Sequence, residues 1–174
     1  MKRVMVIGQP GAGKSTLARA LAARMGLPVV HLDHIHWMAG WVERPMVEKL
    51  PLIRAEEEKD RWIIEGGLSK SWPTRLARAD TLVWVDVGLI RRLYRVLARS
   101  WRYHGQTRPD LPEGCPEQFH AETLEFLWFI LRTARPGRRR MARTYAAFPG
   151  HKARLTTIAE VNAWLDSLPG CRKL

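Results

Sequence analysis

The chain has 174 residues, a length that indicates one compact domain with a sizeable core. Hydrophobic residues make up 46% and charged residues 26%, which excludes a disordered protein, and no apolar run reaches the roughly 20 residues of a membrane span. The two cysteines, Cys115 and Cys171, fit neither a metal-ligand spacing nor a disulfide scaffold, so we expect a cytoplasmic protein with reduced thiols.

The charge is strongly positive and unevenly spread. Lys and Arg number 29 against 17 Asp and Glu, a net charge of +12. Residues 87–154 alone hold 14 Lys and Arg against 5 Asp and Glu, a net +9. A field of this sign concentrates anions, whether nucleotides, phosphorylated metabolites or nucleic acid. Charge alone does not choose among these partners.

Strand and helix patterns alternate along the chain. Short apolar runs predict five strands, at residues 4–7, 29–32, 62–64, 81–85 and 152–155. Helical patterns cover residues 14–25, 45–60 (with a break or kink at Pro51), 89–103, 121–134 and 158–168, and three prolines mark 106–118 as a loop. This alternation predicts an α/β fold of one domain, residues 1–174, with helices on both faces of a five-stranded parallel sheet.

The first turn carries the most specific motif. Residues 8–15, Gly-Gln-Pro-Gly-Ala-Gly-Lys-Ser, fit G-x-x-x-x-G-K-[ST] between a buried-type strand and a helix, which is the context of a P-loop. The glycines are expected to take positive φ and turn N–H groups around an anion, Lys14 to reach the outer phosphates, and Ser15 to ligate Mg²⁺. We therefore predict that ATP and Mg²⁺ bind here, at Gly8, Gly11, Ala12, Gly13, Lys14, Ser15 and Thr16.

Three acids follow predicted strands, at the sheet edge where α/β proteins bind ligands. Asp33 is the candidate for a catalytic base or acceptor contact, and Glu65 for holding the metal through a water molecule. Asp86 has the weakest case of the three. Each could instead be a solvated strand cap. His31, His34 and His36 favour pocket lining or exposure over a metal site.

Arginines recur along the predicted helix 89–103, at Arg91, Arg92, Arg95 and Arg99. Like charges four residues apart destabilise a helix unless an anion lies among them. Together with the P-loop, Asp33 and the Trp-Ile-Ile-Glu-Gly strand end at 62–66, this pattern resembles the nucleoside monophosphate kinase group. His31-Leu32-Asp33 and the stretch from Arg108-Pro109-Asp110 to Glu117 are similar, more closely, to the adenylate-kinase-like topology modulation (FlaR-type) proteins.

That resemblance implies roles for several residues. Arg95 would stack on the nucleotide base and Arg99 would contact the transferring phosphate, so both join Lys14 and Asp33 as predicted catalytic residues. Residues 101–143 would form a basic helical lid over the phosphates, with arginines at 132, 135, 138, 139 and 140. Arg138-Arg139-Arg140 could equally be a solvated basic turn.

The chain also departs from the adenylate kinase pattern. His36 stands where those enzymes carry an arginine, and residues 65–69 replace their Asp-Gly-Phe-Pro-Arg turn. Both arginines that grip the acceptor phosphate are therefore missing, although Lys70 or Arg75 could substitute. Trp37, Trp41 and Trp72 could line an acceptor site or belong to the core.

The leading hypothesis is an ATP-dependent kinase for a small-molecule acceptor. The alternative, from another class of protein, is a nucleic-acid-binding regulator of DNA topology that uses ATP as a switch. The positive charge favours this alternative, and the lack of a helix-turn-helix, zinc-finger or RRM signature disfavours it. A simple NTPase ranks third, because an extended lid serves to exclude water.

Overall fold

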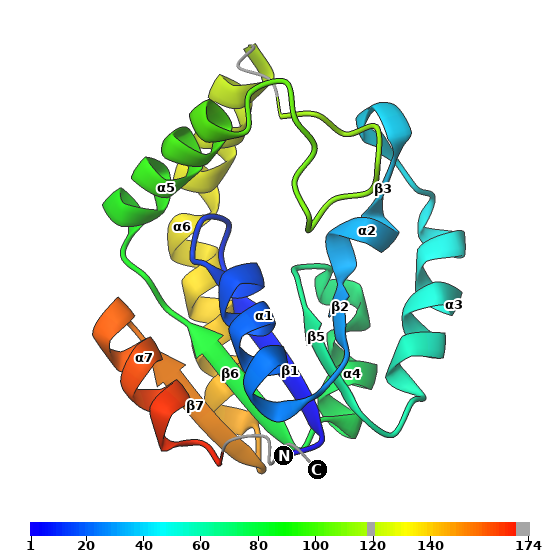
Figure 1. Cartoon of the computed structure of the whole chain (residues 1–174), viewed down its shortest axis with the longest axis vertical. Helices are drawn as coiled ribbons and strands as arrows, with labels where there is room; N and C mark the ends of the chain where they lie inside the picture. The colour runs from blue at the N-terminus through cyan, green and yellow to red at the C-terminus, as the bar shows by residue number, and fades with distance from the viewer. Residues whose placement is uncertain (118–120, 170–174) are drawn as a thin grey trace.

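The computed structural model describes residues 1–117 and 121–169, so Gln118 and Cys171 lie outside the described residues. Five parallel strands form the main sheet in the order β2-β5-β1-β6-β7, with helices on both faces (Figure 1). Their bounds are β1 Arg3–Gly8, β2 Val29–His31, β5 Trp62–Glu65, β6 Thr81–Val85 and β7 His151–Leu155. The predicted α/β P-loop fold is confirmed.

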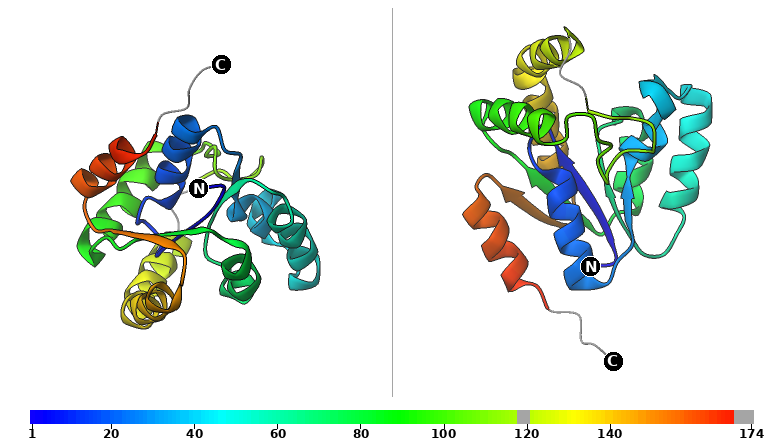
Figure 2. Two further views of the ribbon diagram at one scale, coloured as in Figure 1. Left: turned by 90° about the horizontal axis from the view of Figure 1, so that it is seen from below. Right: turned by 45° about the horizontal axis from the view of Figure 1, so that its top comes forward.

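Alternation along β1 explains the three layers. Val4 and Val6 face one side of the sheet, where they pack with residues of helices α1 (Lys14–Met25) and α7 (Ile158–Ser167). Met5 and Ile7 face the other side, where they pack with residues of α3 (Met46–Glu57), α4 (Trp72–Arg78) and α6 (Ala121–Ala147). Both faces are covered (Figure 2), which is why the central strands read as continuous apolar runs.

Between β2 and β6, the structure differs from the sequence prediction at α2, at α3, at α4 and at a small hairpin. α2 (Leu32–His36) begins one residue before Asp33, which lies in a helical turn and not at a strand end. α3 (Met46–Glu57) continues through Pro51, since its buried residues Lys49, Ile53 and Glu57 hold both halves against the protein. Of the predicted break or kink at Pro51, the break is therefore wrong. α4 (Trp72–Arg78) and the small hairpin of β3 (Trp37–Met38) and β4 (Val42–Glu43) were not predicted.

α5 (Leu89–Arg102) and α6 (Ala121–Ala147) lie side by side (Figures 1 and 2). α6 runs 13 residues beyond the predicted end at Ala134 and passes through Pro136 and the arginine triplet. Proline removes a helix hydrogen bond, and here Gln9 Nε2 donates to the nearby carbonyls of Thr133 and Ala134, at 3.0 Å each. The interpretation of Arg138-Arg139-Arg140 as a turn was wrong.

Candidate active site

The P-loop is held from behind by α5. Arg92 Nε donates to Pro10 O at 2.9 Å and Arg95 Nη1 donates to Ala12 O at 2.7 Å. Arg92 also donates to the Gln9 side chain at 2.7 Å, and Gln9 in turn reaches α6. The repeated arginines are therefore satisfied in part by backbone carbonyls of the P-loop, where the sequence suggested an anion.

The conformation of the loop explains its glycines. Gly11 and Gly13 have φ of 76° and 97°, as predicted, but Gly8 is not among the positive-φ residues. Gly8 is needed for space instead, because a Cβ there would lie 2.8 Å from Val85 O. α1 begins at Lys14 with no side-chain cap on its N-terminus. Its first N–H groups have no intrahelical partners, which suits an anion.

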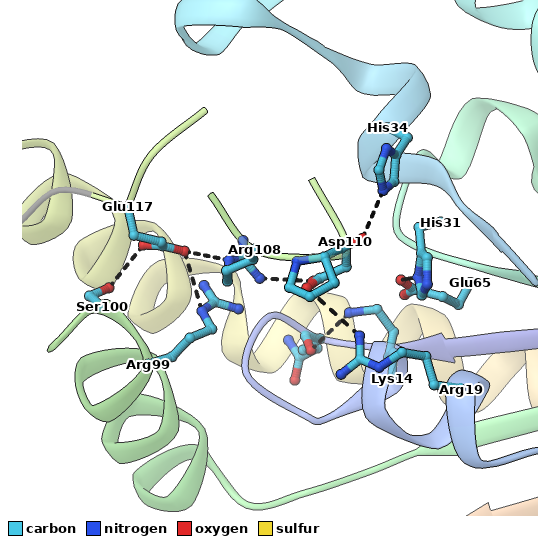
Figure 3. Close-up of polar contacts among 12 residues, drawn as sticks. Lys14, Arg19, His31, His34, Glu65, Arg99, Ser100, Arg108, Asp110 and Glu117 are labelled. Carbon is cyan, nitrogen blue, oxygen red and sulfur yellow. Dashed lines mark hydrogen bonds and ion pairs between the residues drawn. The ribbon is translucent and has the colours of Figure 1, made fainter. Parts of the chain in front are cut away.

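Lys14, Glu65 and His31 converge at the carboxyl edge of the sheet (Figure 3). Lys14 Nζ lies 3.4 Å from Gln9 O, a long hydrogen bond that leaves the ammonium available. His31 Nδ1 lies 2.7 Å from Glu65 Oε1, and Ser15 is close enough to Glu65 to help lower the pKa of its carboxyl. Burial acts to raise the pKa of Glu65, but the His31 hydrogen bond and the Lys14 charge hold it below its ordinary value. Glu65 is thus an ionised carboxylate beside the Ser15 hydroxyl.

Asp33 belongs to the same electrostatic cluster. Burial, followed by the charge of Glu65, raises the pKa of the Asp33 carboxyl, while Lys14 and Arg108 act in the opposite direction. A carboxylate with a raised pKa is a better proton acceptor near neutral pH than an ordinary aspartate. The structure thus brings Asp33, Lys14 and Glu65 within electrostatic reach of one another.

The loop between α5 and α6 supplies a second charged cluster. Arg108 Nη1 donates to Asp110 at 2.8 Å, and Arg108 Nε lies 2.7 Å from Glu117. Arg99 Nε lies 3.5 Å from Glu117, and Arg19 lies 3.8 Å from Asp110 (Figure 3). Arg99, which sequence reasoning placed on the phosphates, therefore points to the loop next to them.

This loop lies against α2 and the β3–β4 hairpin. Trp41 Nε1 donates to Pro116 O at 2.9 Å, and Cys115 Sγ lies 3.2 Å from Met38 O. His34 Nε2 lies 3.1 Å from Pro109 O. Cys115 is a buried free cysteine. The predicted lid, 101–143, comprises the end of α5, this loop and most of α6, and its motion stays a prediction.

Two predicted anion-binding arginines have other partners. Arg138 is paired with Asp86, with Nε at 3.0 Å from Oδ1, and Arg154 Nη2 lies 2.6 Å from Oδ2 of the same carboxylate. Asp86 is buried, so it is neither a solvated cap nor free to hold a metal. Arg75 is fully buried and donates to Gly67 O at 2.8 Å and to Leu68 O at 3.2 Å. Its Nη2 supports the loop after β5 through these bonds, while its Nε and Nη1 have no hydrogen-bond partner in the described part of the chain, so a role for Arg75 toward an acceptor stays a prediction.

Sequence reasoning missed three positioning residues. Gln9 occupies a variable position of the motif, so nothing marked its bridge to α6. Arg108 and Asp110 stood in the quoted Arg-Pro-Asp stretch, and two opposite charges around a proline in a loop were the available signal.

No group of three or more His, Cys, Asp or Glu residues that could hold a metal occurs in residues 1–117 and 121–169. Within the same residues, no helix is long and apolar enough to cross a bilayer.

The chain is similar to an ATPase family and to several kinases. A family model described as ATPase family associated with various cellular activities (AAA) matches residues 4–59. A shikimate kinase of Rhodococcus jostii (strain RHA1) is 31% identical, with 80% of this chain and 84% of that protein covered. A shikimate kinase of Paracidovorax citrulli (strain AAC00-1) is 28% identical, with 65% and 68% covered.

Two solved structures share the fold. The shikimate kinase from Acinetobacter baumannii in complex with shikimate has a TM-score of 0.58 at 15% identity, covering 95% of this chain and 89% of its own. An unliganded sugar kinase from Janibacter sp. HTCC2649 has a TM-score of 0.50 at 14% identity, covering 97% and 96%. The relatives are thus small-molecule kinases, and the closer likeness to topology modulation proteins stays a prediction. The chain belongs to the P-loop kinase family of these shikimate kinases.

Proposed function

We propose that this protein transfers the γ-phosphoryl group of ATP to a hydroxyl group of a small acceptor. The observation that carries the proposal is the convergence of Lys14, Asp33 and Glu65 at the carboxyl edge of the sheet, beside an uncapped helix N-terminus. Cation, base and metal-ordering carboxylate are the groups that phosphoryl transfer needs, because catalysis rests on positioning and charge stabilisation.

The residues of the P-loop fit a triphosphate. Residues 11–16 present N–H groups and the positive end of α1, and Lys14 adds a mobile charge. For Mg²⁺, the Ser15 hydroxyl would be a direct ligand, and Glu65 would hold the ion through a water molecule. One direct ligand from the protein suits Mg²⁺, which keeps several waters and takes other ligands from phosphates. Bound Mg²⁺ would neutralise charge on the phosphate oxygens.

Asp33 orients the acceptor hydroxyl and accepts its proton, helped by a pKa that burial raises. Arg95 and Arg99 supply positive charge from α5, and Arg108 from the loop above the site. Because Arg108 is balanced by Asp110 and Glu117, its position is fixed before any acceptor binds. Water is kept from the reacting atoms by this loop.

The acceptor is a hydroxylated molecule whose binding does not depend on arginines that hold an acceptor phosphate group. The adenylate kinase arginines are absent, and Arg75 is committed to the Gly67 and Leu68 carbonyls. A cation is nevertheless available from α6, since Arg140 Nη1 lies 3.0 Å from Ser69 Oγ in the loop after β5. The relatives that act on shikimate, a hydroxylated acid, make that compound the first candidate to test.

The test is an acceptor panel with ATP–Mg, comprising shikimate, sugars, nucleosides and nucleoside monophosphates, read as ADP release and phosphorylated product. We expect product with one acceptor class, a large loss in Asp33→Asn, and wild-type rates in Asp60→Asn, which alters an exposed aspartate. ADP release that is identical with and without every acceptor would make water the acceptor and overturn the proposal. The nucleic-acid alternative rests on the +12 charge alone.

A further inference from the structure

α5 has two faces of different character. Its inner face, with Arg92 and Arg95, holds the P-loop. Its outer face carries a stripe of four exposed apolar residues that recur every three or four positions: Ile90, Tyr94, Leu97 and Trp101, which are 84%, 70%, 38% and 81% exposed. This spacing places them on one side of the helix, over a length of about 17 Å at 1.5 Å per residue. The outer face therefore has no partner in the described part of the chain.

The surroundings of the stripe are basic. α5 contains five arginines and no acidic residue, and Arg91 and Arg102 are exposed beside the stripe. The neighbouring α6 adds further exposed apolar side chains, Leu124 and Trp128, together with one exposed acid, Glu125, and two exposed arginines, Arg132 and Arg135. Both helices lie at the outside of the molecule (Figures 1 and 2). A contiguous apolar stripe with this much exposure is typical of an interaction surface, whereas single exposed apolar residues are common on any protein.

We propose that the outer face of α5, the stripe, docks on a lipid bilayer that contains anionic headgroups. Aliphatic and aromatic side chains flanked by arginines on a strongly amphipathic helix match a bilayer interface, with the apolar stripe among acyl chains and the arginines at headgroup phosphates. Because the P-loop contacts the opposite face of α5, the docked protein keeps its nucleotide site open to solution.

Charge and shape separate this occupant from two others. A second copy docked stripe to stripe would bring Arg91 and Arg102 of each chain near those of the other, and α5 has no acid to pair with them. Nucleic acid would satisfy the arginines but leave Ile90 and Leu97 against a charged backbone. An anionic bilayer satisfies both the apolar centre and the basic rim.

The test is flotation with vesicles of phosphatidylcholine, with and without phosphatidylglycerol, at low and high salt. We expect binding to the anionic vesicles only, weakened by salt. The variant Ile90→Ser/Tyr94→Ser/Trp101→Ser should lower partitioning by about tenfold or more, because it removes apolar area from the contact. Val47→Ser/Leu52→Ser is the matched control, since it removes exposed apolar side chains from α3.

Thermal unfolding checks that the triple variant folds, and exposed substitutions are expected to leave it near wild type. No flotation with anionic vesicles, or equal flotation of triple variant and wild type, would overturn the proposal. Sedimentation showing a dimer that the triple variant dissolves would assign the stripe to a second copy. Gel-shift binding of duplex DNA that the triple variant loses would assign it to nucleic acid. Either of these last two outcomes also overturns bilayer docking. None of the four outcomes bears on the proposed phosphoryl transfer.

Discussion

Gly11→Ala should damage the P-loop by two separable effects. At φ 76°, any residue with a Cβ is strained, which costs about 1–2 kcal/mol. The new Cβ would also lie 2.5 Å from Arg92 O and 3.0 Å from Val96 Cγ2, so the P-loop and α5 must separate. Overpacking of this kind costs about 1–3 kcal/mol, which makes the expected loss of unfolding free energy about 2–5 kcal/mol.

Gly40→Ala is the matched control, because Gly40 has a φ of 74° with no atom within 4 Å of an added Cβ. It should lose only the strain, about 1–2 kcal/mol. Urea unfolding measures both losses, and calorimetry measures ATP–Mg binding, which only Gly11→Ala should weaken. Equal losses in the two variants, with unchanged nucleotide affinity, would refute the close packing of the P-loop on α5.

Three further predictions concern charged groups. Asp33→Asn should lower kcat by about 10²–10⁴-fold. In the wild type, the raised pKa of Asp33 should place the acid limb of the pH–rate profile above the range of an ordinary aspartate. An unshifted limb would argue against Asp33 as the base. Arg154→Met should cost about 1–2 kcal/mol at pH 7. Burial acts to raise the pKa of Asp86, but hydrogen bonds from Arg138 and Arg154 hold it below its ordinary value. The stability that this pairing contributes is therefore fully present above the pKa of Asp86 in the unfolded chain, and it is lost as the pH falls through the pKa in the folded protein. Urea unfolding at pH 7 and about pH 3 should therefore show the difference shrinking in acid; a constant difference would contradict the pairing. Arg75→Met should lower stability by about 1.5–3 kcal/mol through the lost Gly67 and Leu68 hydrogen bonds, and a neutral result by thermal unfolding would remove Arg75 as a support of the acceptor loop.

Local pattern was enough to predict the sheet and the P-loop. Buried strands of a parallel sheet are apolar on both faces, so residues 4–7 and 81–85 stood out, and the motif fixed Lys14 and Ser15 at the start of α1. Asp33 and Glu65 were predicted by their position after strands, and they lie in one electrostatic cluster.

Tertiary contacts explain the failures. Pro136 predicts a helix end by its own chemistry, yet α6 continues past it, and Gln9, 127 residues earlier, donates to the carbonyls of Thr133 and Ala134 in the turn before it. Arg138 follows in a basic run that suits a phosphate lid, and only the fold brings Asp86 to it. The environment of Arg75 was equally hidden, because charged side chains are mostly exposed and nothing in the sequence marks this one as fully buried.

The central claim is that the P-loop holds the triphosphate of ATP through its amides and Lys14. Calorimetry of ATP–Mg binding to wild type, Lys14→Ala and the exposed-site control Lys59→Ala tests it most directly. Loss of one charged hydrogen bond should weaken binding about 10-fold to 100-fold in Lys14→Ala and leave Lys59→Ala unchanged. Equal affinities of wild type and Lys14→Ala would place the nucleotide elsewhere and contradict the assignment of the site.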